Sequence, residues 1–171
     1  MKTVDATFEV VKEKFSIIYE AVNTYQPSYV MEDSWEFTDK HQGGVTVKNS
    51  NHERNGYKYA IPLNYSLSCL ASDYAKQGRE NPSLEAYVSM QKSLKRDLEA
   101  SEYYIAAKVI DANGNTVLDS FSIGYVFDWS YLDGDDLDDR LKEEVSNADA
   151  ESEVLERLES LKDSVMNIFK N

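Results

Sequence analysis

The stretch 102–127, EYYIAAKVIDANGNTVLDSFSIGYVF, decides the fold most clearly. Apolar and polar residues alternate on both sides of Asn113-Gly114, a dipeptide that favours the tight turn between two antiparallel strands. If Asn113 and Gly114 form the whole turn, Lys108 lies opposite Asp119, and this pair of opposite charges supports that register. The stretch therefore predicts a β-hairpin.

One face of this hairpin should be apolar, because side chains alternate between the two faces of a strand. The two-residue turn predicts that the core-facing residues are Tyr104, Ala106, Phe121, Ile123, Tyr125 and Phe127.

Length and composition limit the class of protein. The chain has 171 residues, of which 31 are acidic and 18 are Lys or Arg, so its formal net charge is −13. A hydrophobic content of 42% is too high for a disordered chain, and a single cysteine excludes an intramolecular disulfide. The negative charge argues against direct binding of nucleic acid, whose phosphates would be repelled. We expect a single α+β domain over 1–171, with an acidic helical segment over 130–171.

The N-terminal stretch carries apolar residues at steps of three and four. This spacing predicts a long N-terminal helix that ends before Pro27 and packs on the core, with a homodimer through this helix as the alternative. The stripe consists of Val4, Phe8, Val11, Phe15, Ile18, Val22 and Tyr25.

The middle of the chain mixes short strands and helices. Alternation predicts three short strands within 34–62, which with the hairpin make a mainly antiparallel sheet of about five strands. A helix is expected over 64–77, although a strand remains an alternative there because the period-two pattern persists to Cys69. Asn81-Pro82 is typical of a helix start, and the core side of that helix should include Leu84, Tyr87, Val88, Leu94 and Leu98.

Residues for catalysis and metal binding are scarce. The only imidazole and thiol groups belong to His41, His52 and Cys69, and their spacing matches no short zinc motif. We expect solvated histidines and a buried cysteine. The acidic segments fit no calcium-binding loop, and no nucleophile or phosphate-binding motif is present. The sequence therefore predicts a protein that is not an enzyme, with no cofactor and no metal.

The N-terminal residues also bear on location. Asp5, Glu9 and Glu13 interrupt the apolar run that a secretory signal requires, and no window is apolar enough to span a membrane. We expect a cytoplasmic protein that does not bind membranes.

Negative charge is concentrated in the last third of the chain. Residues 128–163 hold 14 acidic and 4 basic residues, a net charge of −10, whereas residues 40–96 are net positive. Apolar spacing predicts two helices here, with a break around 147–150. A concentrated block of charge indicates a partner of opposite sign. The candidate partner-binding residues are Asp133, Asp135, Asp136, Asp138, Asp139, Glu143, Glu144, Asp149, Glu151 and Glu153.

Two functions are compatible with these features. The first is a non-enzymatic inhibitor from a mobile element, such as a phage or plasmid, that presents a nucleic-acid-like acidic surface to a basic host protein such as a nuclease. The second is a small dimeric chaperone or immunity-type protein that binds through apolar and tyrosine surfaces. The predicted order of helix, strands, helices, strands and helix is similar to that of bacterial secretion chaperones. Solvated faces on two surface helices would also explain the acidic block.

Overall fold

The computed structural model describes residues 2–170, apart from the side chains of Pro27, Tyr29 and Arg54. The chain combines helices with strands, so the expected α+β class is confirmed. Its strands are β1 (Thr3–Val11), β2 (Phe15–Pro27), β3 (Trp35–Thr38), β4 (Val47–Lys48), β5 (Tyr59–Pro62), β6 (Ser101–Asp111) and β7 (Thr116–Trp129). Its helices are α1 (Tyr29–Ser34), α2 (His52–Asn55), α3 (Leu67–Lys76), α4 (Pro82–Glu99), α5 (Leu137–Asn147) and α6 (Ala150–Ile168).

The chain forms two compact units. Unit 1 comprises residues 1–26 and 102–171, and unit 2 comprises the intervening residues 27–101. The strands form a four-stranded sheet, β1-β2-β6-β7, and a separate three-stranded sheet, β3-β5-β4, rather than the single sheet of about five strands that the sequence predicted. The net-positive segment 40–96 falls within unit 2, and the acidic segment 128–163 within unit 1.

The long N-terminal helix predicted from the sequence is wrong. The segment forms an antiparallel hairpin of β1 and β2, in which Phe8 lies opposite Tyr19 and Val10 opposite Ile17. The turn is closed by a 2.8 Å hydrogen bond from the Lys12 amide to the Phe15 carbonyl. Apolar residues at period two are also present here, and they bury one face of the sheet when the strands pair. The alternative of a homodimer through an N-terminal helix is therefore excluded, because this segment is not a helix.

The β6–β7 hairpin is confirmed, but its loop is longer than predicted. The Asp111 amide donates to the Asn115 carbonyl at 2.9 Å, which leaves three residues between them, and Gly114 adopts φ +84°. A positive φ is inexpensive for glycine, which has no Cβ. Lys108 forms its ion pair with Glu20 on β2, at 2.6 Å, and not with the predicted Asp119.

The longer loop changes which residues of β6 face the core. One added residue shifts the pairing by one, and this exchanges the two faces of a strand. The predicted core face of β7 is confirmed, whereas Tyr104 and Ala106 lie outside the core cluster, although Ala106 is itself buried. The β6 residues in that cluster are Tyr103, Ile105, Ala107 and Val109.

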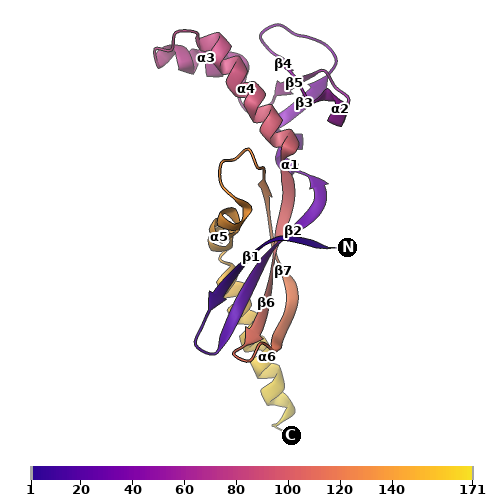
Figure 1. Cartoon of the computed structure of the whole chain (residues 1–171), viewed down its shortest axis with the longest axis vertical. Coiled ribbons are helices and arrows are strands. Elements are labelled where there is room, and N and C mark those ends of the chain that lie inside the picture. The colour runs from indigo at the N-terminus through magenta and orange to yellow at the C-terminus, as the bar shows by residue number, and fades with distance from the viewer. Residues whose placement is uncertain (1, 171) are drawn as a thin grey trace. The chain divides into compact units, whose positions relative to one another are not determined.

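Helices α5 and α6 complete unit 1. Both pack against β7, and α5 also packs against β1 (Figure 1). Leu141, Val145, Ala150 and Val154 join the core. The predicted break between the helices is confirmed, because α5 ends at Asn147 and α6 begins at Ala150. The second half of α6 continues past the hairpin end of the sheet, and residues 159–170 are exposed.

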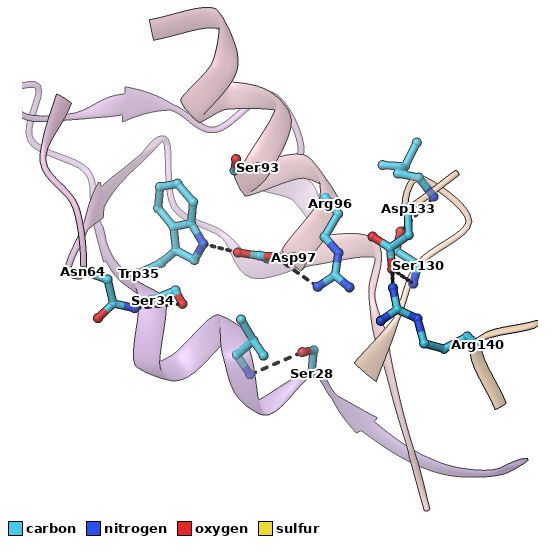
Figure 2. Close-up of polar contacts among 12 residues, drawn as sticks. Ser28, Ser34, Trp35, Asn64, Ser93, Arg96, Asp97, Ser130, Asp133 and Arg140 are labelled. Carbon is cyan, nitrogen blue, oxygen red and sulfur yellow. Dashed lines mark hydrogen bonds and ion pairs between the residues drawn. The ribbon is translucent and has the colours of Figure 1, made fainter. Parts of the chain in front are cut away.

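Unit 2 contains the three short strands that the sequence predicted. β5 pairs with β3 and β4, both antiparallel, and Trp35 lies opposite Pro62, where β5 ends. The Trp35 indole nitrogen donates to Asp97 of α4 at 2.7 Å (Figure 2). This bond satisfies the polar atom of a side chain that is otherwise buried in the core of the unit.

Helices α3 and α4 pack against each other. The prediction of a helix rather than a strand near 64–77 is confirmed by α3, and the predicted start at Pro82 by α4. The predicted core side of α4 is partly wrong, because Leu84 and Val88 are exposed. The buried residues of α4 are Ala86, Met90, Leu94 and Leu98, so the prediction is correct at Leu94 and Leu98 and wrong by two positions in the first half of the helix.

Candidate partner-binding surface

The acidic start of α5 is explained by helix capping. The Asp136 carboxylate accepts a 2.9 Å hydrogen bond from the Asp139 amide, as expected of an N-cap residue. Asp138 and Asp139 occupy the first turn, where the helix dipole favours negative charge. These acidic residues therefore stabilise the helix whether or not they contact a partner.

Arg140 lies close to the carboxylates of three of the predicted site residues. Its guanidinium lies 3.0 Å from Asp135 Oδ2, 3.6 Å from Glu144 Oε1 and 4.0 Å from Asp133 Oδ2. Asp133 also accepts a 3.0 Å hydrogen bond from the Ser130 amide (Figure 2). Partial burial disfavours the charged form of Arg140, but the carboxylates of Asp135 and Asp133 outweigh this effect and raise its pKa.

Glu144 is the most enclosed of the predicted site residues. It is 8% exposed, and its Oε2 accepts a 2.8 Å hydrogen bond from the Tyr125 hydroxyl and a 3.3 Å bond from the Asn147 side-chain Nδ2. With the ion pair to Arg140, its carboxylate has protein partners on both oxygens. Glu144 thus ties α5 to β7 and is not directed at a partner.

Further predicted site residues form ion pairs or hydrogen bonds at the surface. The carboxylate–cation distances are 2.8 Å for Asp139–Lys142, 2.9 Å for Glu153–Arg157 and 2.5 Å for Glu151–Lys12. The Asp149 carboxylate accepts a 2.9 Å hydrogen bond from Ser152 Oγ. Exposed ion pairs contribute about 0–1 kcal/mol, so a basic partner could compete for these carboxylates at small cost.

A third group of acidic residues is exposed and unpaired. Within the part of the chain that the structure describes, their side chains form no hydrogen bond or ion pair, although the charge of Glu143 helps to raise the pKa of Arg140 and that of Asp138 helps to raise the pKa of Lys142. We call this group the unpaired carboxylates: Asp138, Glu143, Glu156, Glu159 and Asp163.

Three of the unpaired carboxylates were missing from the predicted site. Glu156, Glu159 and Asp163 follow each other at steps of three and four along α6, which places them on one face of the helix. That spacing was readable from the sequence. Their lack of partners was not, because it depends on where the basic residues lie in the fold.

Metal-ligating groups do not converge in residues 2–170. His41 and His52 are exposed as predicted, whereas Cys69, predicted to be buried, is exposed on α3. Across these residues, no three His, Cys, Asp or Glu side chains lie close enough to hold a metal ion. In the same part of the chain, no helix combines the length and apolar character needed to cross a membrane.

Comparison of the chain with models of protein families, with curated proteins and with solved structures finds no match. The function is therefore inferred from the surface chemistry alone.

Two buried tyrosines make stability sensitive to alkaline pH. Burial, with smaller effects from Glu151 and Asp149 on Tyr19 and from Asp5 on Tyr103, raises the pKa of each phenol from 10.0 to about 12. The folded state therefore holds these protons more tightly than the unfolded chain, and this stabilisation is complete below pH 10 and lost as the pH rises through 12. Urea unfolding midpoints should fall across this window, and fall less when both tyrosines are replaced by phenylalanine. Equal declines would contradict the prediction.

Proposed function

We propose that this protein is a non-enzymatic binding protein whose acidic helices α5 and α6 engage a basic surface on a partner protein. The observation that supports this most directly is the set of unpaired carboxylates, which are exposed and form no ion pair within the described part of the chain. Unpaired like charges weaken a helix slightly, so their presence favours a role outside the fold.

The specific form of the proposal is an inhibitor from a phage or plasmid that occupies the nucleic-acid site of a host protein such as a nuclease. Helix geometry limits the likeness to nucleic acid. Glu156, Glu159 and Asp163 follow each other at about 4.5–6 Å along the helix axis, against a charge roughly every 1.7 Å in duplex DNA. The protein would therefore match part of a phosphate track and bind through fewer ion pairs than DNA does.

Neutralising the unpaired carboxylates tests this function. Binding to a panel of purified nucleases would be measured at about 0.15 M salt, where charges act over roughly 8 Å. We expect at least a tenfold loss of affinity and a shallower dependence on salt. The test variant carries Asp138→Asn, Glu143→Gln, Glu156→Gln and Glu159→Gln.

A matched control distinguishes the effect of where the carboxylates lie from the effect of the change in net charge. It removes four exposed carboxylates outside α5 and α6 and should bind as the wild type does. Equal affinities of the two variants for a nuclease that the wild type binds would contradict the proposal. The control variant carries Glu9→Gln, Glu13→Gln, Glu80→Gln and Asp119→Asn.

A chaperone or immunity-type function is favoured by one observation, the apolar end of α6. Leu161, Val165, Met166, Ile168 and Phe169 are between 38% and 80% exposed. Contiguous exposed apolar residues are typical of protein-binding surfaces. This function predicts binding that persists at about 0.5 M salt, because burial of apolar area is not screened. Changing Leu161 and Ile168 to serine should then abolish binding, while the quadruple charge variant retains it.

A further inference from the structure

A cleft of about 580 Å³ lies within unit 1, where β1 and β2 meet the junction of α5 and α6. Its apolar lining includes Phe8 and Val10 of β1 and Leu155 of α6. Clefts of this size accept small molecules or a large side chain of a partner. Its polar lining includes Tyr19, Asp149 and Glu151.

Tyr19, which lines this cleft, carries a hydroxyl group without a partner in the described part of the chain. The residue is 0% exposed, and its Oη has no hydrogen-bond partner among the described residues. Buried hydroxyl groups in folded proteins nearly always have a partner, because an unsatisfied polar atom costs about 1–3 kcal/mol. A bound group that hydrogen-bonds to Tyr19 would remove this cost.

Two carboxylates lie near this hydroxyl group and disfavour its ionisation. After burial, the carboxylates of Glu151 and Asp149 are the main causes that raise the pKa of Tyr19 to about 12. Lys12 pairs with Glu151 Oε1 at 2.5 Å, and Lys142, which also lines the cleft, pairs with Asp139 at 2.8 Å. Asp149 and the second oxygen of Glu151 therefore have no paired cation among the described residues. The N-terminus of α6 would favour an anion, but the two carboxylates beside it oppose one. The cleft therefore favours a positively charged occupant.

We propose that the cleft binds an arginine side chain of the basic partner. The aliphatic stem lies against Phe8 and Leu155, and the guanidinium donates to Tyr19 Oη and to the Asp149 and Glu151 carboxylates. A planar guanidinium carries five N–H donors, so it can reach a phenol oxygen and a carboxylate together, which a lysine ammonium does less well. The inference rests on the proposed function, because the arginine belongs to the partner that the acidic helices engage.

N-acetyl-arginine amide is the probe, and its uncharged analogue N-acetyl-citrulline amide is the control ligand. In NMR titrations of the full chain, the arginine probe should shift the backbone amides of residues 149–152 and of β1, and the citrulline analogue should not. Tyr19→Phe should weaken binding about fivefold and Asp149→Asn about tenfold, since hydrogen bonds to charged groups are the stronger kind. Asparagine suits the positive φ of Asp149, and Tyr103→Phe, in the same core but outside the cleft, should bind as the wild type does.

The outcomes separate this inference from the proposed function. If the probe leaves the cleft amides unshifted, or if Tyr19→Phe and Asp149→Asn both bind it as the wild type does, the cleft inference is wrong. Loss of nuclease binding in the quadruple charge variant would still support the proposed function. If the probe binds in the cleft but the quadruple variant binds nucleases normally, the proposed function fails and the arginine site stands.

Discussion

Replacing Leu141 by alanine is expected to lower the free energy of unfolding by about 2–5 kcal/mol, the range for removing a large side chain from a packed core. Leu141 is 0% exposed and lies in the core cluster that joins α5 to the sheet. The loss combines the buried apolar area of the side chain with the cavity left behind, because the strands cannot close over the gap. Urea unfolding followed by circular dichroism would measure it.

Leu161→Ala is the matched control for this prediction. It makes the same chemical change on α6, but Leu161 is 38% exposed and lies outside the core cluster. We expect a loss of less than about 1 kcal/mol, as for most surface substitutions. If the two variants were equally destabilised, the docking of α5 described here would be wrong.

The second large effect is expected at Arg140. Its replacement by methionine leaves Asp133, Asp135 and Glu144 near one another without their shared cation. Removing one partner of a buried ion pair costs about 3–5 kcal/mol, and we expect about 2–4 kcal/mol here because Arg140 is 26% exposed. Thermal and urea unfolding at neutral pH would measure the loss.

Added salt distinguishes charge repulsion from lost packing in this variant. Salt screens the repulsion among the carboxylates, so the difference in unfolding free energy between Arg140→Met and the wild type should narrow as the salt concentration rises from about 0.05 M to about 0.5 M. Lys142→Met removes one exposed ion pair of the same helix and should cost less than about 1 kcal/mol at either salt concentration. A difference for Arg140→Met that does not change with salt would indicate that packing alone is lost.

These results would also show which acidic residues of the segment stabilise the fold. Arg140 and Tyr125 hold Glu144 within the fold, and Asp136 caps α5, so part of the negative charge serves stability. Glu156 and Glu159 have no such partner in the described chain, so their charge does not serve the fold in this way. Net charge alone cannot make this distinction, because paired and unpaired carboxylates count equally in the sum.

Local signals in the sequence determined much of the secondary structure. Asn113-Gly114 located the β6–β7 hairpin, Pro82 marked the start of α4, and the change of apolar phase near 147–150 separated α5 from α6. Such signals act through the backbone of a few adjacent residues, so they can be read without knowledge of distant contacts. The concentration of negative charge in 128–163 is likewise a property of the sequence alone.

Tertiary structure decided the rest. Phe8 fits both the helical stripe and the period-two pattern, and pairing of β1 with β2, which buries one face of the sheet, selected the strand. One extra residue in the β6–β7 loop shifts the strand register by one and exchanges the two faces of the strand. Tyr103 therefore lies in the core in place of Tyr104. Ion pairing of the acidic residues depended on where the fold placed Arg140 and Lys12, since Coulomb attraction is set by distance in space and not by separation along the chain.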